Sequence, residues 1–260
     1  MIRTTQDMHK STMNKHTPFL PGLFLAGLAC CSGIVLADTT VKDQATEGKL
    51  SYHALVIGHG CEDLQPGKTN PVKAQSVVFP TLKPVVTRAD TGEALQWSDV
   101  IDDEAGTGLA GKVELIQDRN IFKAQSLILN EAGNSIGFYS TNGSLQADAL
   151  GLVPFRFSAV SFAPATCARR LLIKLAIADI CSMSFPPKVG TAGLWLPSTT
   201  VRFRDPVLLG DPATLIVNRD LVSNPLPAAQ NCKDGFDVTI KPSAEDIDAH
   251  LPFKGWGRNR

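Results

Sequence analysis

Short apolar runs separated by turn residues follow one another along most of the chain after residue 50. From Leu171 to Ile177 every second residue is Leu or Ile, and Val153, Phe155 and Phe157 likewise fall on one face. A period of two with breaks at Gly, Pro, Asn and Asp is typical of half-buried β-strands. The predicted strands are residues 50–58, 72–79, 112–117, 121–129, 136–140, 152–162, 170–178, 200–203, 213–217 and 236–240.

About ten short strands at this spacing predict an all-β fold, an immunoglobulin-like β-sandwich. No stretch has the pattern of a long amphipathic helix, and short helical turns are expected at residues 145–150 and 244–250. The sandwich is expected to span residues 50–218. A flexible polar lead-in, residues 38–49, precedes it, and a C-terminal extension, residues 219–260, is expected to pack on it.

The amino-terminal segment has the three parts of a secretory signal peptide. Residues 1–18 carry three basic side chains against the single acidic Asp7, and no Asp, Glu, Lys or Arg occurs from His16 to Ala37. Within that stretch Phe19 to Ala29 is mostly apolar, and the small or apolar Val-Leu-Ala that ends at Ala37 suits a signal peptidase. Cleavage after Ala37 is therefore predicted.

Two alternatives to cleavage remain open. Gly27-Leu28-Ala29-Cys30 resembles a lipoprotein box, in which Cys30 would carry a lipid. The uncharged run is also long enough to remain as one membrane-spanning anchor. Cleavage, lipidation and a membrane anchor all place the rest of the chain outside the cytoplasm, so it is expected to be periplasmic or secreted. The chain would meet a membrane only through an uncleaved or lipidated amino terminus.

The charge balance excludes nucleic acid as a partner. The full chain has 25 basic and 25 acidic residues. Residues 1–37 hold three of the basic residues and one of the acidic ones, which leaves 22 against 24 and a formal charge of −2 in the mature chain. Such a chain has no basic field to attract phosphates.

Four cysteines remain in the mature chain, and an even number in an oxidising compartment predicts two disulfides. An extended strand over residues 171–180 would hold Cys167 and Cys181 about 45 Å apart, whereas bridged Cα atoms lie within about 7 Å. Cys61 is therefore expected to pair with either Cys167 or Cys181, and Cys232 with the other.

No sequence motif indicates a catalytic centre. The mature chain has three histidines and lacks His-Glu-x-x-His, Cys-x-x-Cys and Gly-x-Ser-x-Gly. Residues 106–111 fit Gly-x-Gly-x-x-Gly, but they follow the acidic residues 102–104, which would repel a phosphate, so a simple loop is expected. No nucleophile–base signature supports a hydrolase, and we expect the protein not to be an enzyme.

His59 is the principal candidate for a metal ligand. It lies between two glycines and just before Cys61, so a disulfide would hold an exposed imidazole in place. Imidazole is a common ligand of copper and zinc.

His53 would join His59 only across a sharp turn, because an extended strand separates them by about 20 Å. Met183 is a second candidate partner, since its thioether suits Cu(I) and Cys181 lies nearby in sequence. Asp246 and His250 have helical i, i+4 spacing, which is more typical of a solvated turn.

Several segments together resemble the YcnI-like domain family. Val56–Cys61 (Val-Ile-Gly-His-Gly-Cys), followed by Phe79–Pro80, resembles the Val-Pro-His-Gly-Cys…Pro pattern of that family. Leu194–Pro197 and Asp211–Val217 resemble its Trp…Pro-x-Leu-x-Val stretch, and Gln230–Cys232 resembles its Gln-x-Cys element, although out of the usual order. The resemblance covers roughly residues 50–218.

This resemblance implies an extracytoplasmic immunoglobulin-like sandwich that handles copper. Members of the family typically bind Cu(II) through an amino-terminal histidine, aided by a Glu and near a Trp. The present chain departs from that pattern, because its expected mature terminus is Asp38 and His53 lies fifteen residues further on. A ligand set with an amino-terminal histidine therefore does not carry over unless a later cleavage frees His53, whereas His59 and Trp195 occupy matching positions.

The sequence thus predicts a secreted or periplasmic copper-binding protein that acts in metal storage, delivery or homeostasis. Its partners would be the metal ion and an extracytoplasmic protein. The alternative is a structural or adhesion-type β-sandwich that binds a protein or a glycan and no metal.

Overall fold

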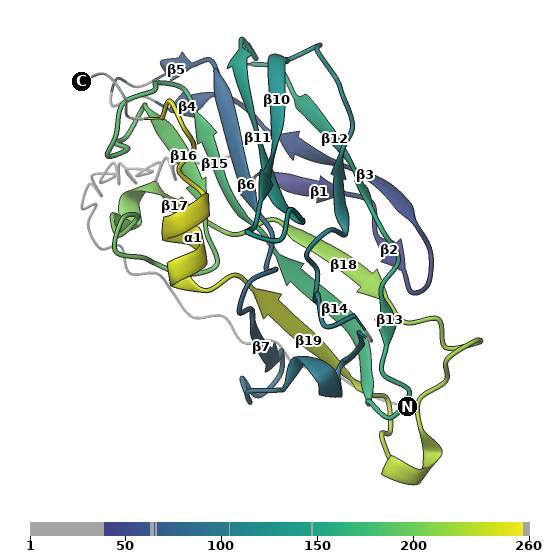
Figure 1. Cartoon of the computed structure of the whole chain (residues 1–260). Helices are drawn as coiled ribbons and strands as arrows, with labels where there is room; N and C mark the ends of the chain where they lie inside the picture. The colour runs from purple at the N-terminus through teal and green to yellow at the C-terminus, as the bar shows by residue number, and fades with distance from the viewer. Residues whose placement is uncertain (1–38, 63–64, 66, 104, 147, 257–260) are drawn as a thin grey trace, which may run out of the picture. The chain divides into compact units, whose positions relative to one another are not determined.

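The computed structural model describes residues 39–62, 65, 67–103, 105–146 and 148–256 (Figure 1). The expected signal peptide and its two alternatives lie outside these residues. Among the described residues, no helix is long and apolar enough to cross a membrane.

One layer of the fold is a four-stranded antiparallel sheet with the order β1-β3-β12-β9. Alternate residues of β3 and β12 face inward, as the period of two predicts, and Leu55, Val153, Phe155 and Phe157 are almost fully buried. The strands are β1 (Thr40–Lys42), β3 (Ser51–Ile57), β12 (Gly151–Phe157) and β9 (Val113–Leu115).

The second layer is a six-stranded sheet with the order β10-β11-β6-β15-β16-β17 (Figure 1). Every residue of its central strands β6 and β15 is buried, so this sheet is covered on both faces. The strands are β10 (Phe122–Leu129), β11 (Ser135–Gly143), β6 (Ala74–Val78), β15 (Ala176–Ile180), β16 (Ala192–Trp195) and β17 (Leu209–Gly210).

A third sheet has the order β2-β18-β14-β19-β7 and contains the parallel pair β14–β19. Its strands are β2 (Ala45–Thr46), β18 (Thr214–Asn218), β14 (Ala168–Lys174), β19 (Phe236–Lys241) and β7 (Val85–Arg88). The smaller elements are β4 (Cys61–Glu62) with β5 (Thr69–Asn70), β8 (Ile101–Asp102) with β13 (Ser161–Phe162), the 3₁₀ helices η1 (Trp97–Asp99), η2 (Pro206–Leu208) and η3 (Ala228–Gln230), and α1 (Ala244–His250).

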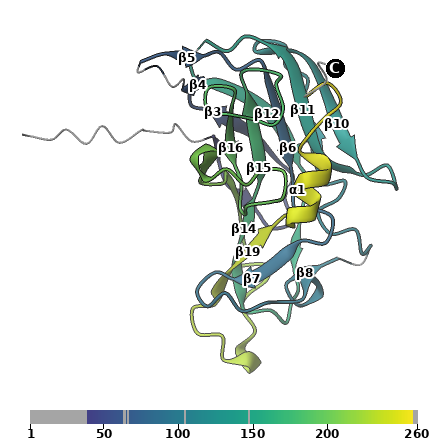
Figure 2. The same ribbon diagram turned by 90° about the vertical axis from the view of Figure 1, so that its left-hand side faces the viewer.

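Two hydrophobic clusters lie on opposite faces of the six-stranded sheet. The larger cluster joins this sheet to the four-stranded sheet, where the ring of Phe155 packs 6.1 Å from Phe138 and 5.7 Å from Phe79. The smaller cluster lies under α1, which supplies Ile247, and under the following segment, which supplies Trp256. Figure 2 shows α1 beside the six-stranded sheet. The predicted all-β sandwich is therefore confirmed, as is the helical turn at residues 244–250.

The predicted boundaries need two corrections. Residues 38–49 were expected to be a flexible lead-in, but β1 and β2 pair there with β3 and β18. Residues 219–260 were expected to be an extension packed on the sandwich; α1 packs on the six-stranded sheet in this way, but β19 lies between β14 and β7 as a strand of the third sheet. In both cases the segment has little alternation of apolar and polar residues, and it becomes a strand because it pairs with strands far away in sequence.

Three expected elements also differ. The apolar run 171–180 is divided at Leu175 into β14 and β15, which belong to different sheets. The strand expected at residues 200–203 is not formed: residues 201–203 are bends, and Phe203 is buried in the smaller cluster. The described residues of the segment 145–150 contain a bridge from Leu145 to Val72 and a turn, and no helix.

Candidate metal centre around His59

Two disulfides occur in the structure, and both fall within the expected pairings. Cys61 is bonded to Cys181 with their Cα atoms 6.0 Å apart, and Cys167 is bonded to Cys232 at 5.3 Å. The first bond joins the start of β4 to the residue that follows β15. The turn that carries His59 is therefore fastened to the central strand of the six-stranded sheet.

His59 lies in this turn between β3 and β4 with about a quarter of its side chain exposed (24%). Its Nδ1 meets the carbonyl oxygen of Gly60, and because a carbonyl only accepts, Nδ1 carries the hydrogen. The other nitrogen, Nε2, lies 3.8 Å from Oε1 of Glu62, whose side chain is 34% exposed. An imidazole nitrogen beside a carboxylate oxygen is a donor pair that suits Cu(II) and Zn(II).

A buried carboxylate lies close to this pair. Asp179 of β15 accepts hydrogen bonds from the Thr39 hydroxyl, from Gln75 Nε2 at 2.7 Å and from Trp195 Nε1 at 2.7 Å. Burial raises the pKa of Asp179, while these three hydrogen bonds and the nearby charge of His59 lower it. Burial is the largest of these effects, so the pKa of Asp179 lies above its ordinary value.

Both ring nitrogens of His53 are hydrogen-bonded to other residues of the fold. Its Nδ1 donates to the Lys42 carbonyl at 3.2 Å, its Nε2 accepts from the Ser51 hydroxyl at 2.7 Å, and its ring packs 5.5 Å from Phe155. Burial lowers the pKa of His53, although the Lys42 hydrogen bond opposes this. Four extended residues of β3 also separate residue 53 from residue 57 by about 13 Å. His53 is therefore a structural histidine.

Met183, the other expected partner of His59, follows by two residues the Cys181 that is bonded to Cys61. Met183 is half-buried against the smaller hydrophobic cluster, where a thioether fills apolar space. Asp246 and His250 both lie on α1, as their spacing suggests. In the part of the chain that the structure describes, no three His, Cys, Asp or Glu side chains are placed to hold a metal ion. The described donor set is thus the His59–Glu62 pair.

Trp195 donates a hydrogen bond to Asp179, the carboxylate that interacts with the charge of His59. Its indole is buried and bonded to Asp179, and a Cβ on Gly210 would come within 2.0 Å of the ring, so only glycine fits there. Sequence reasoning missed Glu62 and Asp179. The sequence does contain a sign that Asp179 is unusual, because it is the one charged residue in the apolar run Ala176–Ile180, which is buried.

Comparisons with known proteins give little further information. No family model matches the chain, and no curated protein matches it. Among solved structures, the chain is similar to an uncharacterized protein from Nocardia farcinica that is described as having an immunoglobulin-like fold. The identity is 10% and the TM-score 0.39, over 68% of this chain and 96% of that one. The assignment of the site therefore rests on its own geometry.

Proposed function

We propose that the chain is an extracytoplasmic copper-binding protein and that His59 is its principal ligand. The observation that carries this proposal is the pairing of His59 Nε2 with Glu62 Oε1 at 3.8 Å, on a turn anchored by the Cys61–Cys181 disulfide. The two disulfides support an oxidising, extracytoplasmic compartment. The positions of His59 and Trp195 support a relationship to YcnI-like domains.

Further ligands would come from solvent or from the amino terminus. Thr39 is hydrogen-bonded to Asp179, and Asp179 interacts with the charge of His59. Cleavage after Ala37 would leave a free α-amino group one residue before Thr39. An amine, an imidazole and a carboxylate are a donor set that fits Cu(II), and the ion would be bound as cargo for storage or delivery rather than for catalysis. Since His59 and Glu62 are partly exposed, the ion could exchange with a partner protein.

The direct test is a Cu(II) titration of the untagged mature chain, residues 38–260, against a competing chelator. We expect binding tighter than micromolar, at least about tenfold weaker binding in His59→Ala, and a smaller loss in Glu62→Gln. His250→Gln is the matched control, because it removes a histidine from outside the site and should leave the affinity unchanged.

Two results would contradict the proposal. The first is wild-type affinity weaker than micromolar, and the second is an unchanged affinity in His59→Ala. Either result would favour the alternative, a sandwich that binds a protein or a glycan without a metal.

A further inference from the structure

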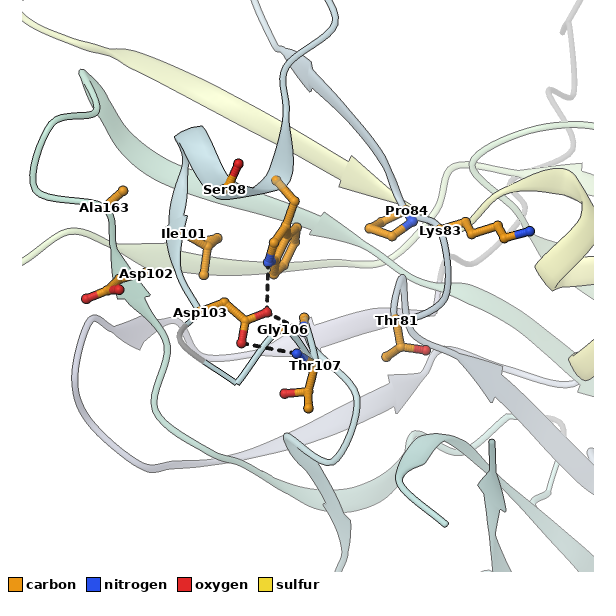
Figure 3. Close-up of a pocket in the computed structure, with 12 residues that line it drawn as sticks. Thr81, Lys83, Pro84, Ser98, Ile101, Asp102, Asp103, Gly106, Thr107 and Ala163 are labelled. Atoms are coloured by element: carbon orange, nitrogen blue, oxygen red, sulfur yellow. Dashed lines mark hydrogen bonds between the residues drawn. The ribbon is translucent and has the colours of Figure 1, made fainter. Parts of the chain in front are cut away.

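A cleft of about 550 Å³, shown in Figure 3, is lined by none of the residues of the His59 turn. Its walls are the segment around Thr81–Pro84, the short helix η1, and the turn that contains Gly106–Gly108. A second hollow of about 870 Å³ shares Thr81, Lys83, Gly106 and Thr107 with the first. The loop at residues 130–134 and one side of α1 line its far part. The two hollows are therefore adjacent, and together they are called the cleft.

A rigidly held indole lines the first part of the cleft. Trp97 packs partly against the larger hydrophobic cluster, and its Nε1 donates to Asp103 Oδ2 at 3.1 Å. The same carboxylate accepts the backbone N–H groups of Thr107 and Gly108 (Figure 3). Gly108 has φ +61° and lies against the indole edge, where an added Cβ would be 3.8 Å from the ring. The Trp97 ring and the turn around Gly108 therefore hold each other in place before any ligand binds.

Hydroxyl, amide and carboxylate groups line the two hollows, and Trp97 lines the first of them. The polar lining residues are Thr81, Ser98, Thr107, Asn130, Asn134 and Ser243. The acidic ones are Asp102, Asp103, Glu131, Glu245 and Asp246, against the single base Lys83. This charge balance repels anionic ligands. One aromatic platform among groups that both donate and accept hydrogen bonds suits sugar rings, which present C–H faces and hydroxyl edges.

One residue of the cleft wall has a carboxylate oxygen that accepts no hydrogen bond from any described residue. Asp246 is 91% buried, and its Oδ2 has no hydrogen-bond partner among the described residues. Burial raises the pKa of Asp246, while the charge of His250 lowers it. Buried carboxylate oxygens normally have a hydrogen-bond partner, so, within the described part of the chain, this wall of the cleft has an unsatisfied acceptor.

We infer that this cleft, lined by Trp97 and the acidic wall, binds a neutral or amino-bearing oligosaccharide. A sugar ring stacks on Trp97, and the following units extend past Thr81 and Lys83 toward α1. The site is separate from the His59 turn, and the inference does not depend on copper binding.

Isothermal calorimetry of the mature chain with cellotetraose, chitosan tetraose and tetragalacturonate tests this inference. We expect saturable binding of one of the first two with a Kd tighter than about 1 mM, and weaker binding of the anionic tetragalacturonate. Trp97→Ala should weaken binding at least about tenfold, and Trp97→Phe should retain most of it because it keeps an aromatic face.

Tyr52→Ala is the control, since it removes an aromatic side chain that is 65% exposed on β3, outside the cleft. Its binding should equal that of the wild type, and Trp97→Ala should retain the wild-type Cu(II) affinity. The inference is overturned if neither the neutral nor the amino sugar binds, if tetragalacturonate binds best, or if both Trp97 variants bind like the wild type. If Trp97→Ala does not fold, a loss of binding in folded Trp97→Phe greater than that in Tyr52→Ala supports stacking, and equal losses overturn it.

Discussion

His53 and His59 are neighbours in sequence but have different environments. Both ring nitrogens of His53 are bonded inside the sandwich, to Lys42 and Ser51. His59 turns one nitrogen toward Glu62 near the surface. The sequence could place His59 on a glycine turn, but it could not show that the strand β3 would bury His53, because periodicity gives the face of a residue and not its hydrogen-bond partners.

The buried state of His53 predicts a pH dependence of stability. Burial lowers its pKa below the ordinary value of 6.5, so below pH 6.5 the unfolded chain binds the proton more readily than the folded one. The free energy of unfolding should therefore fall as the pH drops through 6.5. Urea unfolding at pH 8 and pH 5.5 should show a smaller difference in His53→Gln than in the wild type. An identical difference in the two proteins would contradict this role.

The division of one apolar run between two sheets is the main feature at the scale of elements. β14 pairs with β18 and β19, whereas β15 pairs with β6 and β16. Alternation continues through Leu175 without a break, so sequence pattern alone predicts one strand. The expected exclusion of a Cys167–Cys181 bond nevertheless proved correct, because each half of the run stays extended and keeps these residues apart.

The two disulfides allow a matched test of the His59 turn. Removing either bond as a double Cys→Ala variant should lower the free energy of unfolding by about 4 kcal/mol, since each closes a long loop. Loss of Cys61–Cys181 should also weaken Cu(II) binding by about tenfold, because the turn loses its anchor. Loss of Cys167–Cys232 should leave the affinity unchanged. Equal affinities in the two variants, measured by chelator competition, would contradict the role given to the first bond.

At the scale of the whole molecule, the described residues form a sandwich whose central sheet is covered on both faces. Short alternating runs predicted this class of fold well. They could not predict that the ends of the chain would enter the sheets, because β1, β2 and β19 depend on partners far away in sequence. The cleft beside Trp97 was missed for the same reason, since its walls come from several segments that are far apart in sequence.

The core and disulfides should make folding independent of metal, and copper should add stability by mass action. At a free Cu(II) concentration about one hundred times the Kd, the free energy of unfolding should rise by about 2.7 kcal/mol. His59→Ala should show no such rise at the same concentration, whereas His250→Gln should. Guanidinium unfolding with and without Cu(II) measures the difference. A metal-free chain that is unfolded before denaturant is added would contradict the account.

The most direct measurement of copper ligation at His59 is electron paramagnetic resonance of the mature chain loaded with one equivalent of Cu(II). The account predicts superhyperfine coupling to an imidazole nitrogen that persists in His53→Gln and His250→Gln and disappears in His59→Ala. A spectrum that is unchanged in His59→Ala, or that matches copper free in the buffer, would contradict it.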